Sequence, residues 1–216
     1  MKKSVIFFVV SCFCFGLITQ NSIADINVGL SVGDEGIKEF HLTIGSHFGV
    51  HAKNVEKIKE RSISDEELVV VFFLAQKANV EPTLIVDLRL KGNSWMTIST
   101  KLGLSTEIFY VHFVENPGPP YGKAYGHYKN KPKNSWHKIN LDDNDIVNII
   151  NLKFITSRYG CTVEEIVKLR KRNKSYVSIN SNLKKGKRQK EYTNKTSDQN
   201  QSKSKGKSIK GKSKKK

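Results

Sequence analysis

The amino-acid sequence predicts a mainly α-helical protein with two related trihelical, helix-turn-helix-like units. A connector rich in Pro, Gly and Tyr joins them, and a disordered C-terminal tail follows. Three observations predict this: an internal repeat with helical spacing, a helix start signal before each long repeat, and a C-terminal segment almost without apolar residues. Hydrophobic residues make up 38% of the 216-residue chain, below the roughly 45–50% of an average soluble domain. This composition excludes a polytopic membrane protein, a collagen and a disulfide-dense miniprotein.

Residues 1–24 have the three parts of a secretory signal peptide. Two lysines follow Met1, and residues 5–18 form an apolar stretch shorter than the roughly 20 residues that span a bilayer. Ser22 and Ala24 place small residues at positions −3 and −1 of a cut before Asp25. We therefore expect export to the periplasm, the cell envelope or the medium, with cleavage near Ala24. A retained N-terminal anchor is the alternative.

The number of cysteines that remain in the mature chain depends on this cleavage. Cys12 and Cys14 leave with the signal peptide, so no intramolecular disulfide is expected in the mature chain. Cys161 aligns with two valines in the repeat described next, which predicts a small apolar residue of the core. Residues 9–12 also fit a lipobox. In that alternative Cys12 would be lipidated, and the chain would not be cleaved after Ala24.

Residues 79–99 and 160–180 are similar at a constant offset of 81 residues, without a gap. A shorter third copy at 48–61 keeps apolar residues at the same spacing, which suits a short helix that buries one face. We interpret these segments as copies of one helical unit; a chance likeness among helices is the alternative. The identical pairs are Ile85/Ile166, Val86/Val167, Leu88/Leu169, Arg89/Arg170, Ser94/Ser175 and Ile98/Ile179, and Trp95/Tyr176 is conservative.

Each long copy follows a helix with its own start signal. Ser64 and Glu67 match a capping box before an apolar run, and residues 142–145 are acids and Asn, which the helix dipole favours at a helix start. Pro82 suits the first turn of the next helix and Gly92 its end, after which residues 95–102 predict a third short helix.

The resulting organisation has six parts. Residues 25–39 form an extended segment, in which alternating apolar residues over 25–32 predict a strand. The parts are a signal peptide at 1–24, the extended segment at 25–39, a first helical unit at 40–115, the connector at 116–138, a second helical unit at 139–183 and the tail at 184–216.

The connector contains the most distinctive sequence of the chain, Gly-Pro-Pro-Tyr-Gly-Lys-Ala-Tyr-Gly at residues 118–126. Over residues 40–187 the chain resembles a family of uncharacterised exported bacterial proteins that share a Gly-Pro-Pro-Tyr-Gly-x-Ala-Tyr-Gly element between two helical units. The resemblance implies export and a helical fold, and it carries no activity, catalytic residue or ligand. Residues 91–105 also resemble the turn and second helix of a helix-turn-helix.

Tyrosines alternate with cations in the connector, and such a pattern can stack on bases or sugars while it holds phosphates or carboxylates. The alternative is a rigid linker whose tyrosines pack on the two helical units. The candidate ligand-binding residues are Tyr121, Lys123, Tyr125, His127, Tyr128 and Lys129.

Metal and catalytic motifs give no comparable signal. His47 and His51 are four residues apart and would share one helix face, a geometry that zinc can use, but no third ligand is evident. The sequence has no P-loop, CxxC pair, Rossmann glycine pattern or Ser-His-Asp elbow. We therefore expect no cofactor, no metal and no enzymatic activity.

The net charge of +17 is concentrated in the tail. Residues 184–216 have 14 Lys/Arg and two acids, whereas residues 25–183 have a net charge of only +3. A flexible chain of this charge binds polyanions by releasing counterions, with little specificity. The tail residues expected to bind are Lys184, Lys185, Lys187, Arg188, Lys190, Lys203, Lys205, Lys207, Lys210, Lys212, Lys214, Lys215 and Lys216.

The sequence thus predicts an exported, non-catalytic binding or structural protein of the envelope whose tail associates with an anionic polymer or an anionic lipid surface. After signal cleavage no transmembrane segment is expected. One alternative is a nucleic-acid-binding protein that uses the helix-turn-helix-like units and the basic tail, and nucleic acid could also bind the tail without specificity. Another is an envelope enzyme with a site at residues 116–132.

Overall fold

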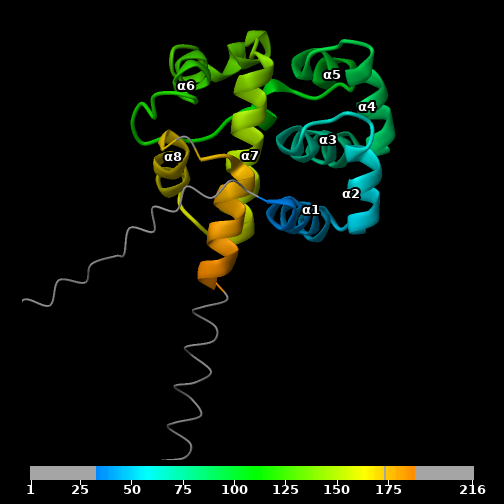
Figure 1. Ribbon diagram of the computed structural model, residues 1–216. Helices are drawn as coiled ribbons and strands as arrows, with labels where there is room; N and C mark the ends of the chain where they lie inside the picture. The colour runs from blue at the N-terminus through cyan, green and yellow to red at the C-terminus, as the bar shows by residue number, and fades with distance from the viewer. Residues whose placement is uncertain (1–32, 173, 188–216) are drawn as a thin grey trace, which may run out of the picture. The chain divides into compact units, whose positions relative to one another are not determined.

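A computed structural model of the protein describes residues 33–172 and 174–187 (Figure 1). Every regular element in these residues is helical, so the predicted mainly α class is confirmed. Within the same residues, no helix has both the length and the apolar character needed to cross a bilayer. The predicted signal peptide, its cysteines and the strand predicted over 25–32 lie outside the described residues.

The first helical pair begins earlier than predicted. Helix α1 spans Asp34–Phe48 and is followed by α2, Ala52–Lys59. The extended segment predicted at 25–39 is therefore wrong over residues 34–39. Two acids in the first turn of α1 favour a helix start there, because they face the positive end of the helix dipole. A Cβ at Gly45 would lie 2.7 Å from the carbonyl oxygen of Val50, so only glycine allows the chain to turn back this closely.

The first long repeat forms α3 (Asp65–Ala78), α4 (Pro82–Leu90) and α5 (Trp95–Lys101). The capping box predicted at the start of α3 is present: the hydroxyl of Ser64 accepts from the Glu67 amide, and the Glu67 carboxylate accepts from the Ser64 amide. Gly92 follows the last residues of α4 with φ of 81°, a left-handed conformation that favours glycine. The sequence located these three helices to within a residue or two.

The segment between the units is more ordered than predicted. It contains the 3-10 helices η1 (Thr106–Phe109) and η2 (Lys133–Lys138), with α6 (Gly122–Lys129) between them. The connector predicted between the two helical units therefore contains helices of its own, α6 and η2. Gly122 and Gly126 stand inside α6, where packing of its aromatic residues outweighs the low helix propensity of glycine.

The second long repeat forms α7 (Asp143–Tyr159), α8 (Val163–Lys171) and a further helical stretch at residues 176–187. Figure 1 shows α7 between α8 on one side and α3 on the other, and α3 and α7 are packed against each other. Helix α7 carries the second predicted start signal, because the Asp142 carboxylate caps it and Asp145 completes a capping box. Both long repeats thus have the same order of a long helix, a short helix and a further helix.

Equivalent positions of the repeat are buried in each copy. The equivalent residues Val55, Ile85 and Ile166 of the three copies are fully buried, as are Ile98 and Ile179 of the two long copies. Ser94 accepts a hydrogen bond from the amide three residues ahead, and so does Ser175. The repeated sequence positions therefore have repeated structural roles. Cys161 packs partly buried against the core, in agreement with its alignment to valines.

The boundary of the predicted tail shifts by four residues. Residues 184–187 continue the helix that begins at 176, and the Lys184 ammonium lies 3.1 Å from the Glu39 carboxylate of α1. Lys184, Lys185 and Lys187 therefore belong to the helix, and the prediction that they are disordered is wrong. The remaining tail residues, from Arg188 onward, lie outside the described residues; residues 188–216 have 11 Lys/Arg and two acids.

Candidate functional site

Tyr121, the first candidate of the connector, lies in the core. Its side chain is fully buried, and its hydroxyl donates to the hydroxyl of Tyr176, which in turn donates to the Asn148 carbonyl at 2.8 Å. Burial raises the pKa of Tyr121 to about 12, so it stays protonated and a donor at physiological pH. Tyr121 thus links the connector to the helix at 176–187 and to α7. A ligand cannot reach it, and its predicted role as a ligand contact is replaced by a structural one.

Lys123 is exposed and is paired with the start of α7. Its ammonium lies 2.7 Å from the Asp142 carboxylate, and this contact lowers the pKa of Asp142. The neighbouring Asp145 is buried at the capping box, and burial together with the Asp142 charge raises its pKa. Lys123 therefore fixes α6 against the N-terminus of α7 and is not directed at the remaining candidates.

Tyr125, Tyr128 and Lys129 are brought together on one side of α6. They line a hollow of about 190 Å³, which we call the aromatic hollow. The segment that follows η1 and the helix η2 supply its other walls. The predicted residue His127 does not line it. Its walls are the rings Tyr110, Phe113, Tyr125, Tyr128 and Trp136, with His112, Lys129, Val111, Ala124 and Ile149 completing it.

The rings of the aromatic hollow are held by hydrogen bonds behind them. The Tyr128 hydroxyl donates to the Thr106 carbonyl at 2.7 Å, and the Trp136 indole donates to the Lys131 carbonyl at 3.0 Å. The Thr106 hydroxyl donates back to the Trp136 carbonyl, which joins η1 to η2. Burial raises the pKa of Tyr128. These hydrogen bonds hold the rings in place before a ligand binds. Little side-chain entropy is therefore lost on binding.

Cations stand beside these rings. The Lys129 ammonium lies 5.3 Å from the centre of the Tyr125 ring, and the Lys133 ammonium lies 5.8 Å from the centre of the Trp136 ring. Both lysines are exposed, whereas Tyr110 and Tyr125 are half-buried. The hollow therefore offers ring faces for packing and the Lys129 ammonium for an anion, whereas Lys133 stands beside Trp136 without lining the hollow.

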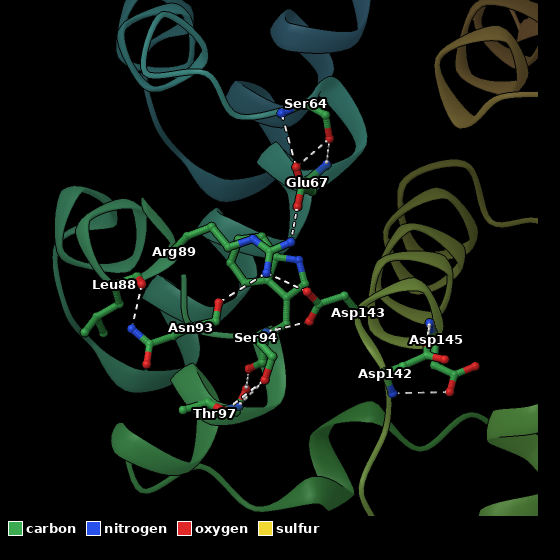
Figure 2. Close-up of polar contacts among 12 residues, drawn as sticks. Ser64, Glu67, Leu88, Arg89, Asn93, Ser94, Thr97, Asp142, Asp143 and Asp145 are labelled. Carbon is green, nitrogen blue, oxygen red and sulfur yellow. Dashed lines mark hydrogen bonds and ion pairs between the residues drawn. The ribbon is translucent and has the colours of Figure 1, made fainter. Parts of the chain in front are cut away.

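A second, larger hollow of about 520 Å³ lies where α3 and α7 begin; we call it the inter-unit cleft. Arg89 is one of the residues that line it, and Figure 2 shows the polar contacts of Arg89. The Arg89 guanidinium lies 2.7 Å from Glu67 of α3 and 2.5 Å from Asp143 of α7, and it stacks on the Trp95 ring at 4.5 Å. The amide of Trp95 donates to the same Asp143 carboxylate at 2.8 Å.

The second repeat makes equivalent contacts in the opposite direction, from its own arginine and aromatic residue to an acid of the first unit. Arg170 stacks on the Tyr176 ring at 4.8 Å and lies 3.5 Å from Glu66 of α3, while the Tyr176 amide donates to Glu66 at 2.8 Å. Each unit thus supplies a carboxylate that receives an arginine and a backbone amide of the other unit. Asp65, the fourth acid of the cleft, is engaged by His41 and Lys59. Because every one of these carboxylates has a partner, we assign the cleft to the joining of the two units.

The predicted histidine pair is not formed on one helix. His47 belongs to α1 and His51 precedes α2, with a left-handed Gly49 between them. His47 packs against Phe48 and Phe154, and burial, followed by the Arg158 charge, lowers its pKa. In the part of the chain that the structure describes, no group of three His, Cys, Asp or Glu side chains is placed to hold a metal.

Sequence reasoning missed the aromatic residues Tyr110, His112, Phe113 and Trp136 of the aromatic hollow. They lie before and after the Gly-Pro-Pro-Tyr-Gly element at residues 118–126, and the packing of η1 against η2 brings them to α6. The available signal was the high aromatic content of residues 109–136, which extends beyond the Gly-Pro-Pro-Tyr-Gly element on both sides.

Comparison with known proteins gives no relative from which a function could be transferred: no family model, no curated protein and no solved structure matches the chain.

Proposed function

We propose that this is an exported, non-catalytic binding protein of the envelope that associates with an anionic polymer. The observation that carries the proposal is the separation of charge along the sequence. Residues 188–216 have 11 Lys/Arg against two acids, with two apolar side chains larger than alanine, so their cations far outnumber their acids. Such a segment binds any dense row of phosphates or carboxylates.

The contacts of the folded residues support a binding role over catalysis. The acids of the inter-unit cleft are engaged by arginines, lysines and backbone amides, and Lys123 is engaged by Asp142. The aromatic hollow is different, because its exposed Lys129 and half-buried rings suit non-covalent recognition. A polymer could therefore be held by the cationic segment and by the hollow together, which raises the overall affinity without further contacts.

The polymer half of the proposal is tested by removing the cationic segment. A chain that ends at Lys187 keeps all described helices, and we expect it to lose retention on an immobilised polyphosphate at low salt. The matched control is a full-length chain in which the 11 cations after residue 187 are replaced by Gln. It should behave like the shortened chain if charge, and not length, is responsible.

The export half is tested by the mass of the mature protein. We expect an N-terminus at Asp25 in protein recovered from the envelope or the medium. Intact chains that start at Met1 and stay in the cytoplasm would contradict export. If in addition a chain that ends at Lys187 preferred one DNA sequence, the nucleic-acid-binding alternative would replace the proposal.

A further inference from the structure

The aromatic hollow has the features of a site for a single ring that carries a negative charge. We propose that it binds one six-membered sugar ring bearing a carboxylate, as a unit of an acidic polysaccharide. This inference rests on the proposed function and deepens it, because it names the class of polymer.

The size of the hollow limits the ligand to one ring. Its volume of about 190 Å³ is below the roughly 300–1,000 Å³ of sites for drug-sized molecules. Tyr110 and Tyr125 are half-buried, so they present part of their ring surface to an incoming group. A unit of a longer polymer can enter such a shallow, open site while its neighbours on either side remain in solvent.

The charges at the hollow select an anion. Lys129 and Lys133 stand beside the Tyr125 and Trp136 rings, and His112 lies close to the Tyr110 hydroxyl at 3.3 Å. No acid lines the hollow. A carboxylate on the ring would therefore meet the Lys129 ammonium at the wall, while the Asp145 and Glu107 charges act on Tyr128 from outside the lining.

The orientation of the rings favours a sugar over a nucleobase. A flat base that is held between two aromatic side chains needs two ring faces that lie nearly parallel. Here Tyr110 and Trp136 are tilted by 35°, Tyr128 and Trp136 by 80°, and Phe113 and Tyr125 by 87°. A sugar needs only one ring face for its C–H groups, and its hydroxyls can reach hydrogen-bonding groups at the edge, such as those of Tyr110 and His112.

Trp136 allows a direct test by fluorescence with the full mature chain. Trigalacturonate is titrated at raised salt, where multiple contacts of the cationic segment are suppressed but a single charge contact loses little. Maltotriose serves as the neutral sugar and uridine monophosphate as the nucleotide. We expect a saturable change with trigalacturonate that is absent in Trp136→Phe, and weaker binding of the other two probes.

Two matched substitutions test which cation selects the anion. We expect Lys129→Gln to lower the affinity for trigalacturonate about fivefold, the worth of one partly exposed charge contact, and to leave maltotriose unchanged. Lys138→Gln removes the same charge from η2 at a position that does not line the hollow, and it should leave both affinities unchanged. Equal thermal midpoints of the two variants show that folding is not the cause.

The outcomes separate this inference from the proposed function. Tighter binding of the nucleotide, equal effects of the two lysine substitutions, or no change of Trp136 emission with any probe would overturn the sugar site. Retention on polyphosphate that still depends on residues 188–216 would leave the proposed function in place in each of these cases.

Discussion

At the scale of single residues, the connector tyrosines divide into structural and accessible ones. Tyr121 is fully buried at the end of a hydrogen-bonded chain to Tyr176 and Asn148, whereas Tyr125 is half-buried at the aromatic hollow. The sequence pattern alone could not separate them, because both are followed by Gly and both lie near lysines.

Removal of the Tyr121 hydroxyl should weaken the fold and leave the hollow intact. In Tyr121→Phe the Tyr176 hydroxyl loses its buried donor, and we expect the free energy of unfolding to fall by about 1 kcal/mol. Urea unfolding measures this change, with Tyr125→Phe as the control that should stay within about 0.5 kcal/mol. An unchanged stability of Tyr121→Phe would contradict the structural role.

A second residue, Lys153 of α7, is half-buried, and its ammonium donates to the Ile108 carbonyl of η1 at 2.6 Å. Burial, with a smaller contribution from the Lys77 charge, lowers the pKa of Lys153 to about 8. At pH 7 the folded protein therefore bears the cost of a half-buried ammonium. Between pH 8 and the ordinary pKa of 10.5, the unfolded chain holds a proton that the folded chain has released, so stability rises with pH in this window.

Replacement of Lys153 by Met tests this directly. We expect Lys153→Met to be more stable than the native chain at pH 7, by about 1 kcal/mol after allowance for solvent access. The difference should shrink at pH 9, where the native lysine is largely neutral in the folded state. A difference that is the same at both pH values would show that packing, and not charge, is responsible.

At the scale of elements, the two long repeats are joined by arginines that occupy equivalent positions. Arg89 donates a hydrogen bond to the Asn93 carbonyl of its own unit and also contacts Asp143 of the other unit. In the same way, Arg170 donates to the Lys174 carbonyl of its own unit and contacts Glu66 of the other unit. Only the planar guanidinium serves a carboxylate, a carbonyl and an aromatic face at once. This dual task gives a physical reason why the same residue stands in both copies.

Arg89→Lys should therefore cost more than a charge-conserving change usually does. The lysine keeps one cation but cannot serve Glu67 and Asp143 together, and we expect the free energy of unfolding to fall by about 1–3 kcal/mol. The matched control is Arg61→Lys at the exposed pair with Asp87, which should change stability by less than about 0.5 kcal/mol. Equal effects of the two substitutions would show that Arg89 does not join the units.

The contact between Glu67 and Arg89 also makes the stability of the fold depend on pH. Burial opposes ionisation of Glu67, but hydrogen bonds from Ser64 and Arg89 and the Arg89 charge together lower its pKa below the ordinary value of 4.5. The stabilisation is therefore complete above pH 4.5 and is lost as the pH falls through the lowered value.

At the scale of the whole molecule, the sequence predicted the helical class and the order of helices in both long repeats. Capping boxes, Pro82 and Gly92 act locally, so their signals can be read without the fold. The start of α1 and the helices of the connector were missed, because their stability comes from packing against distant segments. The aromatic hollow could be predicted only in part for the same reason: Tyr125, Tyr128 and Lys129 belong to α6, whereas Tyr110 reaches the hollow from the end of η1 and Trp136 from η2.

The division between a folded helical body and a cationic segment is the central claim, and salt dependence tests it most directly. The measurement is the slope of log affinity for polyphosphate against log salt, for the full mature chain and for a chain that ends at Lys187. With 11 cations after residue 187, we predict a slope of about −5 to −8 for the full chain and of about −1 or less in magnitude for the shortened chain. A shortened chain that keeps most of the slope would contradict the claim, because the anion would then be held by the helical body.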